Sequence, residues 1–133
     1  MIVLDTNIVL DLLVFSDPAT IALSRRLQSQ ELRWLSTQPM RDELERVLGY
    51  PQIARRLDAR GSTAATVLTA FDTMATLAPP APKAAVTCKD PDDQKFIDLA
   101  VQHIVPLLSK DHAVLCMKKR LLALGVVAQP AIE

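Results

Sequence analysis

The feature that most constrains the fold is a short apolar run, Ile-Val-Leu at residues 2–4, which ends abruptly at Asp5. Apolar residues then resume at helical spacing from Ile8. This pattern predicts a buried parallel strand that delivers Asp5 at its carboxyl end, with a helix just beyond it. Sites in open α/β sheets form outside the carboxyl ends of the strands. A carboxylate there needs a cation, a donor or water, so Asp5 either caps the helix or belongs to a site.

Length and composition indicate one globular domain over residues 1–133. Hydrophobic residues make up 50% of the chain, yet no apolar run reaches the roughly 18 residues of a membrane span, so we expect no membrane association. Without a recognisable secretory signal, and with only Cys88 and Cys116, we expect reduced thiols in the cytoplasm. Zero net charge argues against holding nucleic acid by charge alone. One Trp, one Tyr and three Phe leave little for a base-stacking platform.

Apolar segments alternate with helical patterns along the chain. Strands are expected at residues 2–4, 32–35, 84–87, 105–109 and 126–128. Helices are expected at residues 8–14, 18–30, 37–48, 51–59, 62–77, 89–104 and 111–124, with an extended proline-rich connection at 78–82. Strands that alternate with helices predict an α/β fold with a mainly parallel sheet and helices on both faces.

Two further segments place acids where they could meet Asp5. Asp111 follows the expected strand 105–109 at the start of a helix, so it too is either an N-cap or a site residue. In the helix 37–48, Glu43 lies on the flank of the apolar face, whereas Asp42 points almost directly away from it. The alternative for Glu43 is a solvated helix face on which it pairs with a neighbouring arginine, Arg41 or Arg46.

The aspartate cluster at residues 90–93 gives the clearest pattern. The helix dipole favours acids in a first turn, which explains their presence in general terms. At about 100° per residue, however, Asp93 falls in line with the apolar stripe of this helix. Asp98 falls on another side, where we expect it to be solvated. Helical phase thus favours Asp93 over Asp92, and the choice between the two rests on phase alone.

Carboxylates gathered at one cleft repel each other, so such a site needs protons or a cation. Oxygen ligands of this kind suit Mg²⁺ or Mn²⁺, which activate water and offset the charge of a phosphate. The basic residues near these segments either contact a nucleic-acid backbone or are ordinary surface charges: Arg41, Arg46, Lys89, Lys95 and Lys110. His103 and His112 are expected to be helix residues rather than ligands.

These motifs resemble PIN-domain ribonucleases over about residues 1–115. The run Val-Leu-Asp-Thr-Asn at 3–7 is similar to the first strand and acidic turn of that family, and residues 35–36 and 43–48 to its second strand and acidic helix. The Lys-Asp-Pro-Asp-Asp opening at 89–93 resembles one branch of the family. Residues 107–111 resemble its strand-end Thr/Ser-x-Asp motif, with Lys110 where the family usually has glycine.

The resemblance implies a three-layer α/β/α sandwich and a divalent-metal-dependent endoribonuclease. It implies these catalytic acids: Asp5, Glu43, Asp93 and Asp111. Of these, Asp5, Asp93 and Asp111 would hold Mg²⁺ or Mn²⁺, and Asn7 and Ser109 would support them. Many relatives are VapC-like toxins of toxin–antitoxin pairs, which implies an RNA substrate, an antitoxin partner and a homodimer.

Two other functions remain open at this point. The chain could be a non-catalytic PIN-fold module that binds RNA or a regulatory protein. It could also transfer phosphoryl groups through an aspartyl phosphate on Asp5, although Asn7 stands where such enzymes carry a second acid.

Overall fold

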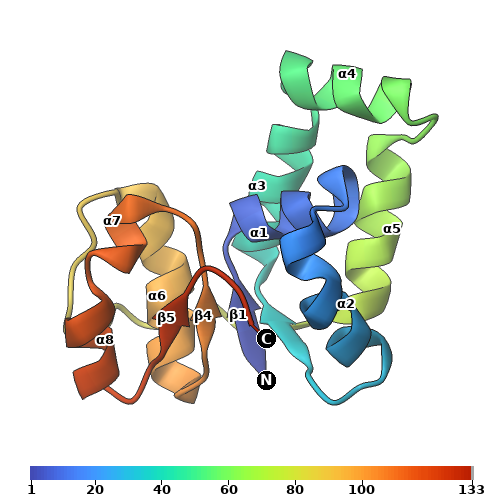
Figure 1. The fold of residues 1–133 in the computed structure, drawn as a ribbon. Coiled ribbons are helices and arrows are strands. Elements are labelled where there is room, and N and C mark those ends of the chain that lie inside the picture. Colours follow the sequence, from blue (N-terminus) through green and yellow to red (C-terminus); the bar gives the residue numbers. More distant parts are fainter. Residues whose placement is uncertain (133) are drawn as a thin grey trace.

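The computed structural model describes residues 1–132 and contains a five-stranded parallel sheet (Figure 1). The strands lie in the order β3-β2-β1-β4-β5, and all four neighbouring pairs are parallel. Their bounds are β1 Ile2–Leu4, β2 Trp34–Ser36, β3 Ala75–Leu77, β4 Leu107–Leu108 and β5 Ala128–Gln129. The chain builds outward from β1 to β3 and then returns to the other side of β1. The point where the strand order reverses therefore lies between β1 and β4, which is where α/β sheets open a crevice.

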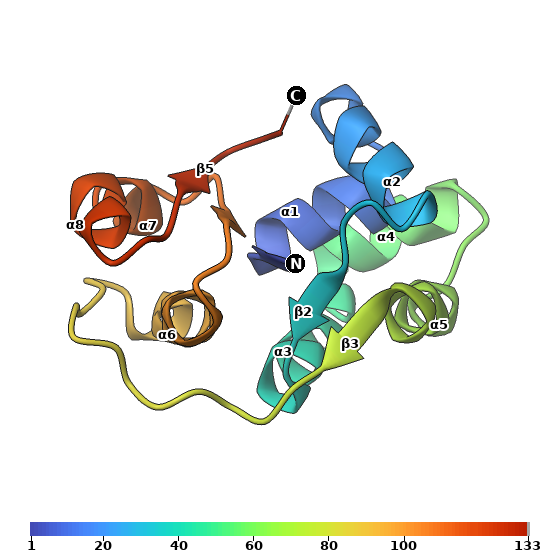
Figure 2. The same cartoon turned by 90° about the horizontal axis from the view of Figure 1, so that it is seen from below.

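Helices connect the strands. Before β3 they are α1 Thr6–Leu10, the π-helical η1 Asp11–Phe15, η2 Pro18–Thr20, α2 Ile21–Gln28, α3 Gln38–Leu48, α4 Pro51–Ala59 and α5 Ala64–Met74. After β3 they are η3 Pro91–Asp93, α6 Gln94–His103, α7 His112–Leu115 and α8 Lys118–Ala123. Figure 2 shows α1, α2 and α5 on one side of the sheet and α6 and α8 on the other. The prediction of a three-layer α/β/α fold is confirmed.

The sheet separates two apolar clusters, because successive strand residues point to opposite faces. Ile2 and Leu4 pack with the helices between β1 and β3, whereas Val3 packs with the C-terminal helices. All three side chains are buried. The apolar run that opens the sequence is thus covered on both faces, as a central parallel strand requires.

The edge strand was predicted at the wrong segment. Residues 75–77 pair with β2, although the sequence favoured an extension of the preceding helix. Helix α5 ends at Met74, and the next residue, Ala75, already has an extended backbone, with φ −92° and ψ 144°. Residues 84–87 form no strand. Since Ala75–Leu77 suits either state locally, pairing with β2 decides its conformation, and the sequence pattern does not contain that information.

The prediction that Asp98 is solvated is also wrong. Its side chain is buried, and it accepts hydrogen bonds from the Ala84 backbone N–H at 2.9 Å and from Gln94 Nε2 at 2.7 Å. The helical projection assumed one buried stripe, but the segment after β3 covers a second side of α6. Gln94 also donates to the Val86 carbonyl at 3.0 Å, so this segment is fastened to α6 just behind the 90–93 turn.

Cys88 and Cys116 are free thiols, as expected. His103 and His112 are exposed residues at the end of α6 and the start of α7. Within residues 1–132 no single helix is long and apolar enough to cross a membrane. The pair Thr6–Phe15 and Pro18–Gln28, bent by 105°, reaches that length and composition only when taken together.

We expect Asp98→Ala to lower the free energy of unfolding by about 1–3 kcal/mol, because it leaves the Ala84 N–H and the Gln94 amide without their acceptor. Urea denaturation measures the change. The control is Asp42→Ala, since Asp42 is exposed on α3, and we expect it to stay within about 0.5 kcal/mol. Equal effects of the two substitutions would contradict this account of Asp98.

Candidate active site

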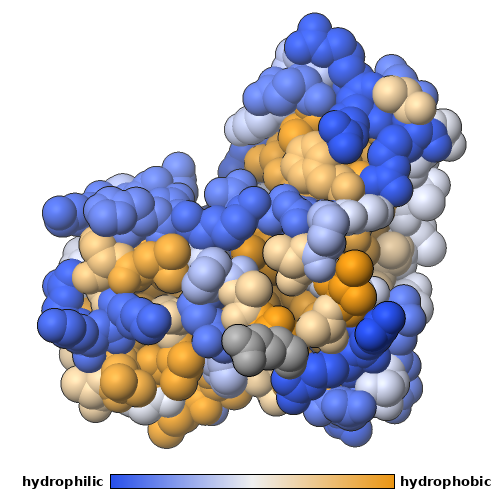
Figure 3. All heavy atoms as spheres, in the orientation of Figure 1, coloured by the Kyte–Doolittle hydropathy of each residue, from blue (hydrophilic) through white to orange (hydrophobic). Residues whose placement is uncertain are grey.

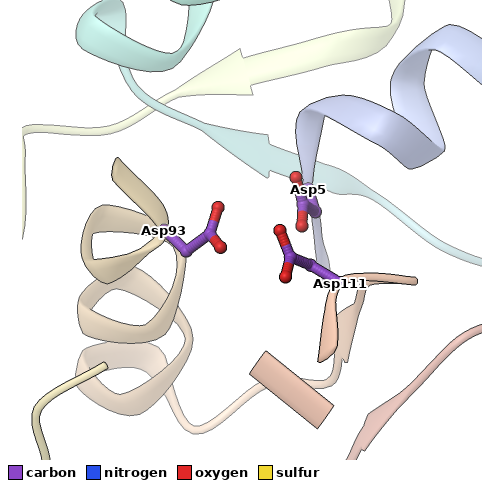
Figure 4. A group of neighbouring side chains, drawn as sticks. All are labelled: Asp5, Asp93 and Asp111. Atoms are coloured by element: carbon purple, nitrogen blue, oxygen red, sulfur yellow. The ribbon is translucent and has the colours of Figure 1, made fainter. Parts of the chain in front are cut away.

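Three aspartates meet at the point where the strand order reverses. Asp5 directly follows β1, Asp111 lies beyond β4, and Asp93 ends the short helix that leads into α6. Figure 4 shows the three carboxylates pointing toward one another. One oxygen of each lies within 4.8 Å of the others. Segments that are far apart in the sequence thus bring three oxygen donors to one position.

Asp5 acts both as a helix cap and as a member of this group. One of its oxygens accepts a long hydrogen bond from the Asn7 backbone N–H, at 3.4 Å, at the start of α1. The other accepts a short one from Ser109 Oγ, at 2.6 Å. Ser109 in turn accepts from the Asp111 backbone N–H at 3.0 Å, so Ser109 links the ends of the two neighbouring strands. Asp5 therefore caps α1 and at the same time belongs to the group of three carboxylates.

Asp111 caps α7 by accepting from the Ala113 backbone N–H at 2.9 Å. Asp93 has a different environment. Its side chain is 7% exposed, and its Oδ2 atom is buried without a hydrogen-bond partner. A buried, unpartnered carboxylate oxygen costs free energy unless something outside the protein satisfies it.

Burial and like charges shift the titration of the buried acids. Burial is the main cause that raises the pKa of Asp93, to about 8, and the charge of Asp5 and the proximity of Asp111 add to the shift. Burial also raises the pKa of Asp5, while the hydrogen bond from Ser109 opposes that shift. The site thus disfavours negative charge that a cation does not offset.

The structure brings Asp93, and not Asp92, into the three-carboxylate group. Asp92 is exposed, although it lines the same cavity. Helical phase was the only feature that distinguished the two in the sequence. It was sufficient because Asp93 sits on the side of the helix that faces the sheet.

Glu43 lies at the edge of the site, outside the group of three. Its carboxylate accepts hydrogen bonds from the Thr6 hydroxyl and from Lys95 Nζ, the latter at 3.0 Å. It pairs with neither Arg41 nor Arg46. Arg41 binds Asp72 at 2.7 Å and Glu45 at 3.5 Å, and Arg46 forms no salt bridge within residues 1–132. The sequence analysis included Lys95 only among several basic residues, and it did not identify Thr6 as a partner of Glu43. The only feature of the sequence that could have pointed to Thr6 is its position next to Asp5.

An open cavity of about 340 Å³ adjoins the carboxylates. This volume is within the range of about 300–1,000 Å³ typical of small-molecule sites. Figure 3 shows a hollow between the parts that carry α7 and α4, with hydrophilic residues along its border and apolar surface beneath α4. Acids, polar residues and apolar residues all line the cavity: Asp5, Glu43, Asp90, Asp92 and Asp93; Thr6, Asn7 and Gln52; Leu10, Val47, Tyr50 and Ile53.

Two of the lysines near the site are paired with acids outside the central group. Lys95 binds Glu43, and Lys110 binds the buried Asp11 at 2.5 Å. Within residues 1–132, none of the salt bridges involves Asp5, Asp93 or Asp111. The three central carboxylates therefore lack a protein cation, which is the arrangement expected of a site for a hard divalent ion.

A family model described as PIN domain matches residues 1–113 of the chain. The match includes the strands β1 to β4 and all four acids of the site, and it ends before α8 and β5. No curated protein and no solved structure matches the chain.

The raised pKa of Asp93 predicts that the metal-free protein loses stability as pH rises. Between the ordinary value of 3.8 and about 8, the folded state binds more protons at Asp93 than the unfolded state, so the free energy of unfolding falls across this range. Asp93→Asn removes this penalty, and an asparagine amide can donate to the neighbouring carboxylates. In urea denaturation with EDTA, we expect Asp93→Asn to be more stable than the wild type at pH 8, by about 1–3 kcal/mol, and the difference to shrink at pH 5.

Asp92→Asn is the matched control, because Asp92 is its exposed neighbour. It should change stability little at either pH. A variant Asp93→Asn that is less stable than the wild type at pH 8 would contradict the electrostatic description of the site.

Proposed function

Since the chain belongs to the PIN-domain family, whose members are generally nucleases, we propose that it is a divalent-metal-dependent endoribonuclease. The observation that carries this proposal is the convergence of Asp5, Asp93 and Asp111 within 4.8 Å. Mere sharing of a fold would not require three acids from separate segments to meet at one buried position, where their mutual repulsion is costly.

The donor set fits Mg²⁺ or Mn²⁺. All three side chains offer hard carboxylate oxygens, and the Oδ2 atom of Asp93 is buried without a partner. No cysteine or histidine belongs to the group, within the described part of the chain, so the ligands do not resemble those of a zinc site. A bound divalent ion would satisfy the unpaired oxygen and offset the charges that raise the pKa of Asp93.

In this proposal Asp5, Asp93 and Asp111 hold the ion. When bound, the ion supplies the acidity that makes water a nucleophile near neutral pH and offsets the charge on the phosphate. Glu43, which lines the same cavity, orients the attacking water or accepts its proton. Ser109 fixes the orientation of Asp5 through its 2.6 Å hydrogen bond. Asn7 supports the site through its backbone N–H to Asp5 and its exposed side chain at the cavity.

Lys95 is a positioning residue for Glu43. Its ammonium group donates to Glu43 at 3.0 Å and to the Asp92 carbonyl at 2.5 Å, and it lies 4.9 Å from the centre of the Phe96 ring. This arrangement ties the acidic helix α3 to the turn that carries Asp93. The distance between the proposed base and the proposed ion site thus depends on Lys95.

The biological role that we propose is that of a VapC-like toxin that acts in the cytoplasm. The resemblance to the PIN-domain family supports this role, because many relatives in that family are VapC-like toxins. The proposed substrate is RNA, and the proposed partners are an antitoxin and a second copy of the chain.

We expect Asp5→Asn and Asp93→Asn to lower Mn²⁺-dependent cleavage of RNA more than about 100-fold, because the loss of an outer contact to a metal ligand already costs about 10–100-fold. Asp92→Asn, the exposed neighbour, should retain cleavage within a few-fold. The assay follows cleavage of a labelled RNA with and without Mn²⁺, and circular dichroism checks that each variant is folded. Wild-type levels of cleavage by Asp5→Asn, or no metal-dependent cleavage by the wild type, would refute the proposal and favour a non-catalytic binding module.

We expect Lys95→Met to lower kcat by about 10–100-fold while the affinity for Mn²⁺ changes little, because Lys95 contacts Glu43 and not the three aspartates. Lys95→Arg keeps the charge and should recover part of the loss. Arg41→Met is the control, because Arg41 lies on α3 with Glu43 but binds Asp72. A loss of Mn²⁺ affinity as large as the loss of kcat would show that Lys95 acts on the ion site instead.

A further inference from the structure

Within residues 1–132, Tyr50 is the most exposed of the Phe, Trp and Tyr side chains. Of the five aromatic residues of the chain, Trp34, Phe71 and Phe96 are buried and Phe15 is partly buried. Tyr50 is 44% exposed, and it lines the cavity beside the carboxylates. A large aromatic side chain that remains exposed in a cavity is available to a ligand.

The backbone around Tyr50 holds it at a fixed corner between two helices. Its N–H donates to the Val47 carbonyl at 3.0 Å, where α3 ends. Its carbonyl accepts from the N–H groups of Ile53 and Ala54, at 3.0 and 2.8 Å, where α4 begins. Pro51 occupies the first position of α4 and restricts the chain further. Little backbone entropy is therefore lost when a ligand packs against this residue.

The cavity combines two kinds of lining. The carboxylates Asp5, Glu43 and Asp93 belong to the proposed reaction. A separate apolar lining comes from three helices and the corner between them: Leu10, Val47, Tyr50 and Ile53. Gln52 also lines the cavity and offers both a donor and an acceptor. A flat group with an apolar face and a polar edge matches this set of side chains.

We infer that Tyr50 and the apolar lining form a subsite for one nucleobase of single-stranded RNA, next to the phosphate that the carboxylates process. This inference rests on the proposed function, because it places a phosphodiester at the aspartates. The base stacks on the Tyr50 ring, and Gln52 hydrogen-bonds its edge. Bases in a duplex are already stacked and cannot enter, so the substrate is RNA with an unpaired base at the cleavage site.

An apolar peptide segment fits the same cavity less well. It would cover Gln52 and the neighbouring carboxylates without offering them hydrogen bonds, and buried polar groups without partners are costly. A nucleobase has polar edge atoms in the plane of an apolar ring, so it can satisfy both kinds of lining. A single aromatic contact also agrees with a chain of zero net charge, which cannot bind RNA by overall charge.

The test measures the affinity of a short labelled single-stranded RNA by fluorescence anisotropy in the presence of Mn²⁺. All proteins carry Asp5→Asn so that the RNA stays intact. Loss of one base–aromatic contact should weaken binding about 5- to 100-fold in Tyr50→Leu, which keeps apolar bulk without a ring. Tyr50→Trp should retain the affinity. Leu122→Ala, which alters an exposed apolar residue on α8, is the control and should bind like the reference protein.

The RNA provides a second arm of the test. An abasic nucleotide at the bound position should weaken binding to the reference protein as much as Tyr50→Leu does, and combining the two changes should cost little more. Affinity for a blunt double-stranded RNA should be the same in all variants. Thermal unfolding of Tyr50→Leu checks that the corner between α3 and α4 remains folded.

Equal affinity of Tyr50→Leu and the reference protein, or no measurable binding by the reference protein, would overturn the inference and leave the apolar lining as a surface for a protein partner. Cleavage by the wild type is measured separately. Wild-type cleavage together with unchanged affinity in Tyr50→Leu refutes the subsite alone, whereas Tyr50-dependent binding without any cleavage refutes the proposed function alone.

Discussion

Three carboxyl groups held together beyond the ends of β1 and β4 constrain the rest of this structure. Asp5 and Asp111 follow adjacent parallel strands, so their carboxylates lie at the same edge of the sheet. Asp93 joins them because α6 packs its apolar stripe against the sheet, and Phe96, Ile97 and Ala100 are fully or almost fully buried. The favourable burial of these apolar side chains offsets the cost of bringing the carboxylates together. Packing of the core thus keeps the acids close together although their electrostatic repulsion opposes this arrangement.

The basic residues around this centre have a consistent arrangement. Lys95 pairs with Glu43, Lys110 with Asp11, and Arg41 with Asp72, so each of these three cations pairs with an acid other than the three central ones. These pairs connect segments that the chain separates widely. The central carboxylates keep their need for a cation, which is the property that a divalent-metal site requires. Lys110 stands where the family usually has glycine, and its ion pair with Asp11 shows that the position accommodates a long side chain.

Chemistry and recognition come from different elements of the fold. The acids lie at the ends of β1 and β4 and at the start of α6, whereas the apolar lining comes from α1, α3, α4 and the corner at Tyr50. The two sets meet in one cavity because α3 carries both Glu43 and Val47, one turn apart. Helix α3 therefore sets the distance between the proposed position of the reacting phosphate and the proposed position of the bound nucleobase. Under the proposed function, substitutions in the apolar lining alter which RNA is bound while the acids stay unchanged.

The sequence by itself determined the parallel α/β class, the central strand at residues 2–4 and the positions of the acids along the chain. Periodicity and strand-end chemistry are local properties, so they could be read without coordinates, and helical phase was sufficient to favour Asp93 over Asp92. Only the tertiary structure decided that residues 75–77 pair with β2, that Asp98 is covered by the segment after β3, and that Glu43 binds Thr6 and Lys95 instead of an arginine. These outcomes depend on contacts between residues distant in sequence, and such contacts form only when the packed core brings their segments together.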